Sequence, residues 1–138
     1  MEWRQLLSAD DGYELGPGAA VSEVATVEAA LGAVFPAQLR EVYLASDGVF
    51  DRPGQWFVIW PLAEVVVRNG KAWSLTDSPV RRGLVGFGDD GTGAPFCIPR
   101  DGGRGVFAWS AIDGQATLLA GTVAGFWSGW LTGTLPRH

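Results

Sequence analysis

The sequence predicts an α+β domain in which helices pack against a mostly antiparallel sheet of about five or six strands. Residues 83–109 alternate short apolar runs with turns rich in glycine and aspartate, a pattern typical of neighbouring antiparallel strands. Residues 22–31 and 122–133 instead repeat apolar side chains every three or four positions, which indicates amphipathic helices. The chain has 138 residues, of which 47% are hydrophobic, so it can bury one core. We therefore expect a single domain spanning residues 1–138.

The centre of the sheet is expected in a meander of three strands at residues 84–87, 95–98 and 105–109. Each run is about five residues long, the usual length of a strand, and has turn-forming residues on both sides. The turns at 88–93 and 100–103 contain glycines, which adopt positive φ readily. They also contain aspartates, which can accept hydrogen bonds from the backbone two residues further on.

The first 20 residues are expected to form an N-terminal arm or short helix followed by a loop. Trp3, Leu6 and Leu7 have helical spacing, so we expect these side chains to lie on the body of the domain. Residues 10–18 contain several turn-forming residues and are predicted as the loop.

Two helices are predicted next. Ser22 is a suitable N-cap for the first, which Gly32 would end. Pro36 suits the first position of the second, because a missing N–H costs nothing there. Asp47 and Gly48 would end that helix.

The middle of the chain is predicted as loop, strand, helix and loop. Residues 49–54 are expected to be a turn or irregular loop, and the aromatic and β-branched run 56–60 a strand. A short helix follows over 62–69 with Gly70 as its C-terminal cap, and residues 71–82 are expected to be a loop.

The final elements have stronger local signals. Asp113 and Gly114 form a hairpin-turn pair that leads into a strand at 116–119. Thr122 is a suitable N-cap for the last helix, which Gly133 would end.

The charge distribution favours a protein partner over nucleic acid or a membrane. The formal charge is −5, and nine acidic residues but only two arginines precede residue 52. Nucleic acid and anionic lipid both attract surfaces with a surplus of lysine and arginine. The acidic first half is compatible with a basic partner, and equally with acids that simply keep a small domain soluble.

The chain shows neither a secretory signal nor a run of about 18 apolar residues that could span a membrane. We therefore expect a cytoplasmic protein.

No set of residues in the sequence points to catalysis, a metal or a cofactor. Cys97 is the single cysteine and lies between apolar neighbours, so we expect it to fill the core. The single histidine is His138, the last residue, which leaves no candidate for a catalytic triad or a zinc site. We therefore predict a protein that is not an enzyme and needs no cofactor.

Residues 86–91 match G-x-G-x-x-G, but the pattern is not expected to bind a dinucleotide. That motif works where a helix N-terminus follows, whereas here a strand follows and two carboxylates would repel phosphate. Asp89 and Asp90 could in principle hold a divalent cation. We favour a turn stabilised by their side chains, because the alternating acids of a calcium loop are missing.

Most of the seven tryptophans are expected in the core. Trp56 and Trp60 share one face of their predicted strand, which would leave one of them at the edge of the sheet and available to a partner.

Taken together, these segments resemble the SUKH superfamily, which contains a fungal cell-wall assembly regulator and many bacterial immunity proteins of toxin systems. The similar segments are 27–32, Phe35-Pro36, Leu39-Arg40, 46–48, 59–65 with Asn69, 87–93 and 106–109. The resemblance implies the same α+β fold as the residues themselves predict.

The chain departs from this family at four positions. The family often has an acid after the glycine turn, where this chain has Ala94. It also has polar residues after the strand tryptophan, where this chain has Ser110, Ala111 and Ile112. If those polar groups line a shared pocket in relatives, this chain has lost part of it.

The resemblance implies a non-enzymatic protein-binding domain, and we expect an immunity protein that neutralises a cognate toxin. The alternative is a housekeeping interaction module in cell-wall or stress regulation. Toxins that act on nucleic acid, such as nucleases, present basic clefts, so acidic residues would speed encounter with them. The candidate contacts are Asp47, Asp51, Glu64, Asp89 and Asp90, with Trp60 as an anchor.

Overall fold

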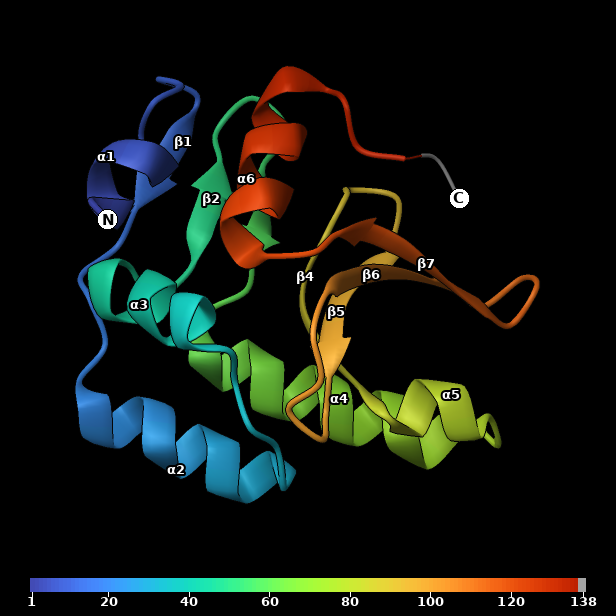
Figure 1. Cartoon of the computed structure of the whole chain (residues 1–138). Helices are drawn as coiled ribbons and strands as arrows, with labels where there is room; N and C mark the ends of the chain where they lie inside the picture. The colour runs from blue at the N-terminus through green and yellow to red at the C-terminus, as the bar shows by residue number, and fades with distance from the viewer. Residues whose placement is uncertain (137–138) are drawn as a thin grey trace.

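The computed structural model describes residues 1–136, so His138 lies outside it. Its seven strands form one antiparallel sheet in which each strand pairs with the next along the chain (Figure 1). The strands are β1 (Tyr13–Leu15), β2 (Val49–Asp51), β3 (Trp56–Ile59), β4 (Leu84–Asp89), β5 (Pro95–Pro99), β6 (Val106–Ser110) and β7 (Gln115–Ala120). The helices are α1 (Trp3–Leu7), α2 (Val21–Leu31), α3 (Ala37–Ala45), α4 (Leu62–Leu75), α5 (Pro79–Arg82) and α6 (Val123–Thr132).

The predicted α+β class is confirmed, with more strands than the five or six expected. The meander of β4, β5 and β6 lies where predicted, and β7 follows the hairpin turn at Gly114, which has φ +68°. Thr122 caps α6 by accepting the N–H of Gly125, and Gly133 ends the helix in the left-handed region.

Two expected loops contain strands instead. The predictions for residues 10–18 and 49–54 were wrong where these segments form β1 and β2. Each strand has only three residues, and β2 is held between β1 and β3. Val49 is fully buried in this arrangement. The stabilising contacts come from distant parts of the chain, so local signals miss them.

Some predicted helix ends are displaced by one or two residues. Helix α2 begins before Ser22, and Glu23 accepts the N–H of Ala20 in place of a Ser22 cap. Pro36 is the residue just before α3 and not its first residue. The predicted end of α2 at Gly32 is confirmed, with φ +59°.

Helix α4 is the main correction to the predicted fold. Gly70 does not end it, and the helix continues to Leu75 through what the sequence predicts as loop. Trp73 stabilises the extension, because its indole N–H donates to the carbonyl of Leu84 at 3.1 Å and its ring stacks under Arg100 at 3.9 Å. A short helix, α5, then starts at Pro79.

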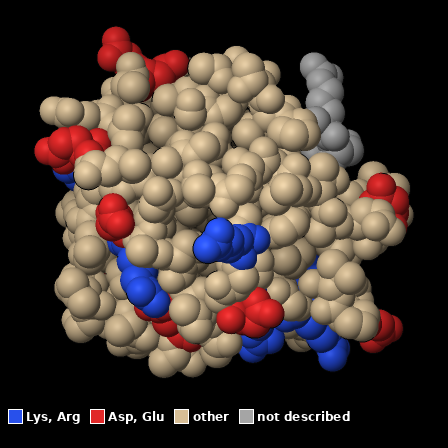
Figure 2. Space-filling view, in the orientation of Figure 1, with Lys and Arg blue, Asp and Glu red and all other residues tan. Residues whose placement is uncertain are grey.

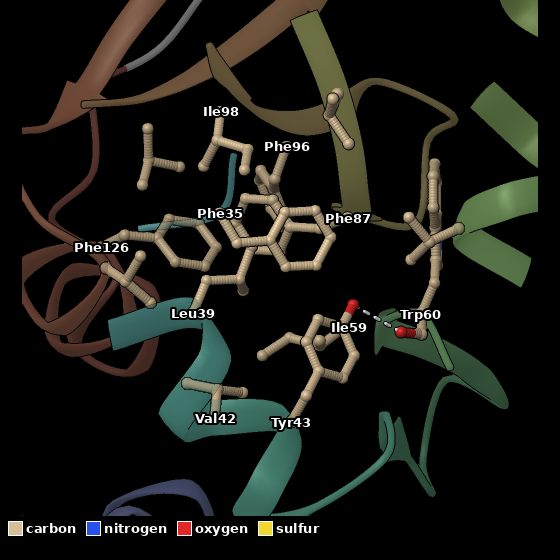
Figure 3. Packing of buried hydrophobic residues seen from close by; sticks show 14 of the residues in the cluster. Phe35, Leu39, Val42, Tyr43, Ile59, Trp60, Phe87, Phe96, Ile98 and Phe126 are labelled. Atoms are coloured by element: carbon tan, nitrogen blue, oxygen red, sulfur yellow. Dashed lines mark hydrogen bonds between the residues drawn. The ribbon is translucent and has the colours of Figure 1, made fainter. Parts of the chain in front are cut away.

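The main core fills the space between the helices and one face of the sheet. Figure 3 shows aromatic and aliphatic side chains from α3, the sheet and α6 packed together, with the Tyr43 hydroxyl bonded to the carbonyl of Trp60. Phe126 of α6 meets Phe87 and Phe96 edge to face, at centroid distances of 5.6 and 4.7 Å.

A smaller cluster lies apart from this core. It consists of Leu84, Cys97 and Trp109, with Phe107 and Ala116 packed against it. All five come from strands β4 to β7, so this cluster belongs to the opposite face of the sheet.

Asn69 joins helix α4 to the open edge of β4. Strand β3 pairs with β4 only at Gly88, which leaves Gly86 without a strand partner on that side. The buried Asn69 side chain takes that place: its oxygen accepts the Gly86 N–H at 2.7 Å and its nitrogen donates to the Gly86 carbonyl at 2.8 Å. The helix therefore lies along the sheet at a fixed position, and this sets the geometry of the surface beside it.

Candidate functional site

A groove runs along α4, between this helix and the sheet. We call it the α4 groove; its volume is about 710 Å³. It is lined on the helix side by Glu64, Val67, Arg68, Lys71, Ala72, Leu75 and Thr76, and on the other sides by Trp60, Arg81, Asp89, Gly93, Pro95, Trp109 and Ala111. Its size falls in the range of ligand and peptide sites in proteins.

The groove exposes apolar side chains that a folded domain normally covers. Val67 is 65% exposed and Leu75 77% exposed, and both project from α4. In the adjoining hollow, which shares Trp109 and Ala111 with the groove, Ile112 at the β6–β7 turn is 100% exposed. Exposed apolar side chains that border a groove and the hollow beside it are typical of protein interaction surfaces.

Three of the six predicted contact residues meet at this groove, namely Trp60, Glu64 and Asp89. The expectation that Trp60 serves as an exposed anchor does not fit its position, because only 5% of the residue is accessible. Strand β3 ends one residue earlier, and the Trp60 indole turns inward to donate to the Asp89 carboxylate at 2.9 Å. Arg68 covers its ring at 4.8 Å.

The other predicted contacts lie elsewhere and bond to backbone groups. Asp47 accepts the N–H of Leu62 at 2.8 Å and so caps α4 from outside the helix. Asp51 accepts the N–H of Gly54 in the β2–β3 turn. Asp90 borders a separate hollow of about 460 Å³ beside α6. The predicted acidic contacts are therefore dispersed and do not form one patch.

The charge on the visible face agrees with this dispersal. In Figure 2, acidic side chains stand at separate places around the molecule, while lysine and arginine side chains lie at the centre, at the left and at the lower right, where Figure 1 shows α4 and α5. That segment carries Arg68, Lys71, Arg81 and Arg82 against Glu64 and Asp77.

The glycine turn after β4 is held by its own aspartates, as predicted. Asp89 accepts the N–H of Gly91 at 2.8 Å, and Asp90 accepts the N–H of Thr92 at 2.9 Å. Strand β5 follows this turn, which leaves no helix N-terminus to receive the phosphates of a dinucleotide. Within residues 1–136 no three histidine, cysteine or acidic side chains are grouped to hold a metal ion.

The four positions that depart from the family pattern come together in space. Ala94, Ser110, Ala111 and Ile112 line a hollow of about 340 Å³ with Trp109, and this hollow adjoins the α4 groove. The polar pocket considered from the sequence would occupy this place. In this chain its lining is largely apolar.

Cys97 belongs to the small cluster with Leu84 and Trp109 and is fully buried, as expected for a core residue. Burial raises the pKa of its thiol from 9.0 to about 12, although nearby Arg81 acts in the opposite direction. The thiol therefore stays protonated in the folded protein at neutral pH, which suits packing and not nucleophilic attack.

We expect Cys97 to react with a thiol reagent at pH 8 only after the chain is unfolded in urea.

The raised pKa of Cys97 also makes the stability of the protein depend on pH. Above pH 9 the thiol releases its proton in the unfolded chain but keeps it in the folded protein. The free energy of unfolding therefore falls as pH rises. From pH 8 to pH 10 the stability difference between wild type and Cys97→Ala should narrow by about 1 kcal/mol in urea titrations. A constant difference would contradict the raised pKa.

Among the groove residues that sequence reasoning missed, four matter most for binding, namely Val67, Lys71, Leu75 and Arg81. Three of them lie on α4, and two of these fall in the part that the sequence predicts as loop. The available signal was the spacing of four residues that continues from Val65 through Asn69 to Trp73, together with the Ser78-Pro79 start of α5.

The residues that carry the family resemblance have structural partners. Glu28 pairs with Arg40 at 3.0 Å and accepts the N–H of Phe35, which fixes the connection from α2 to α3. Asp47 holds the start of α4 and Asn69 holds its middle, through the bonds described above.

No helix within residues 1–136 is both long and apolar enough to cross a membrane.

Comparisons with known proteins agree with this fold. Among curated proteins, none matches the chain with statistical significance. A model of the SMI1 / KNR4 family (SUKH-1) matches residues 18–128, which include all but the ends of the fold. The chain therefore belongs to the SMI1 / KNR4 family (SUKH-1).

Proposed function

We propose that this protein is a non-enzymatic binding domain, and that it serves in the cytoplasm as an immunity protein that neutralises a cognate toxin. The observation that carries the proposal is the α4 groove, which exposes Val67 and Leu75 and adjoins a hollow that exposes Ile112. Burying these side chains against a partner would remove apolar surface from water at about 25 cal/mol per Å². Membership of the SMI1 / KNR4 family supports this function.

The partner we propose is a basic toxin such as a nuclease. The first 51 residues contain nine acids and two arginines, and the negative field of this half would attract a basic protein. Asp47 and Asp51 belong to this half, and Glu64, Asp89 and Asp90 add negative charge at separate places further along the chain. Their expected role is to speed association, since dispersed surface charges affect encounter rates more than affinity.

Calorimetry with the product of a neighbouring toxin gene tests the proposal. We expect tight 1:1 binding, and protection of cells that produce the toxin. Val67→Asp combined with Leu75→Asp should weaken binding strongly, because it places two charges in the apolar contact. Val21→Asp is the matched control, since Val21 is 71% exposed on α2 and lies outside the groove.

Absence of binding to any neighbouring toxin would contradict the proposal. Binding to an endogenous cell-wall or stress regulator would favour the alternative of a housekeeping interaction module. The gene neighbourhood separates the two, because an immunity protein is expected beside its toxin.

A further inference from the structure

We propose that the α4 groove recognises a carboxylate, supplied by an aspartate or glutamate that is flanked by apolar residues in a segment of the protein partner. This inference rests on the proposed protein-binding function and specifies the chemistry of the docking segment. Two cations without acidic partners, Arg81 and Lys71, carry it.

Arg81 is a buried cation. It is 4% exposed, and its guanidinium group donates to the carbonyl of Leu84 at 2.8 Å and to the side-chain oxygen of Asn69 at 3.4 Å. Both acceptors are neutral. In the described part of the chain, carboxylates pair only with Arg40 and Arg68, so none neutralises Arg81.

Burial of the Arg81 charge is energetically unfavourable as long as no anion pairs with it. A buried charge loses its hydration, and burial lowers the pKa of this arginine from its ordinary value. Buried charges in proteins are normally paired with an opposite charge. Arg81 borders the groove, so a carboxylate seated there would supply the missing pair and could accept hydrogen bonds from the planar guanidinium group.

Lys71 adds a second cation to the same groove. It is exposed on α4, between Val67 and Leu75, and its ammonium group has no hydrogen-bond or carboxylate partner within residues 1–136. The remaining charges of the groove are already engaged. Arg68 pairs with Glu64 at 3.0 Å, and the Asp89 carboxylate accepts from the Trp60 indole and the Gly91 amide. The unpaired charge of the groove is therefore positive.

The apolar part of the groove determines what surrounds the carboxylate. Val67 and Leu75 lie on one wall, and Pro95 and Trp109 lie on the other. A free metabolic acid would leave these surfaces in water. A peptide segment with apolar residues on both sides of its acid would cover them, and a volume of about 710 Å³ accommodates several side chains.

The test is a selection from a random-peptide phage library with the full chain as the target. We expect enriched peptides to contain an aspartate or glutamate between apolar residues. In a synthetic copy of such a peptide, replacing the acid by its amide should weaken binding about tenfold or more, as loss of a charged hydrogen bond does. Lys71→Glu should weaken binding to a similar extent. Arg104→Glu, an exposed change outside the groove, should leave binding unchanged.

Arg81 also donates a hydrogen bond to the carbonyl of Leu84, the first residue of β4. Its replacement would therefore alter stability as well as binding. Lys71→Glu is therefore the decisive variant. Peptides without acids, peptides insensitive to Lys71→Glu, or failure to enrich any peptide would overturn the inference. A Lys71→Glu protein that still neutralises the toxin at full strength would also overturn it while leaving the proposed function intact.

Discussion

Replacement of Asn69 by leucine is expected to destabilise the protein by roughly 2–5 kcal/mol. Leucine has a similar size but no polar atoms, so the N–H and carbonyl of Gly86 would be left buried without partners. Arg81 would lose one of its two acceptors as well. Such a change is a large fraction of the stability of a small domain. Urea unfolding followed by tryptophan fluorescence measures it directly.

Lys71→Ala is the matched control for Asn69→Leu. The residue lies two positions further along α4 and is exposed, so its removal should change stability by no more than about 0.5 kcal/mol. Equal urea midpoints for Asn69→Leu and wild type would show that α4 does not depend on these bonds.

Replacement of Gly88 by alanine is expected to cost roughly 3 kcal/mol or more. Gly88 is the β4 residue that pairs with β3, and a methyl group on it would overlap the carbonyl oxygen of Val58. Its next neighbours would be the Val58 carbonyl carbon at 3.0 Å and the Ile59 Cα at 3.2 Å, both backbone atoms. The two strands would have to separate at their only paired position, which calorimetry would detect as a lower Tm.

Gly70→Ala should have the opposite effect. Gly70 is inside α4, and an added methyl group would meet no atom within 4 Å. Alanine favours the helix over glycine by about 0.5–1 kcal/mol, so this variant should be more stable than wild type. A lower Tm for Gly70→Ala, or an unchanged Tm for Gly88→Ala, would contradict the packing described here.

Elements with signals at both ends were predictable from the sequence. Helix α6 is bounded by Thr122 and Gly133, and both act locally, through a side-chain cap and a left-handed backbone. The meander was predictable for the same reason, since its turns contain their own hydrogen-bond acceptors in Asp89, Asp90 and Asp101.

Elements that depend on distant contacts were not predictable in this way. Gly70 predicts a helix end, but Trp73 packs against Arg100 and bonds to Leu84, and these contacts extend α4 past it. Strand β2 is held by its neighbours β1 and β3. Its own three residues carry no signal of either neighbour.

The candidate site was predicted only in part. Trp60, Glu64 and Asp89 were named from the sequence and do meet at the α4 groove, although Trp60 is buried. Lys71 and Arg81 were missed, because residues 71–82 carry turn-forming residues that predict a loop. Their alignment in one groove depends on the packing of α4 and α5 against the sheet.

Hydrogen–deuterium exchange of the full chain, measured with and without the product of a neighbouring toxin gene, tests most directly whether the α4 groove is the docking surface. We predict that binding slows exchange mainly in residues 62–76 and at the β6–β7 turn, residues 110–114, which border the groove and the hollow beside it. Slower exchange confined to α1, β1 and β2, with residues 62–76 unchanged, would contradict this account.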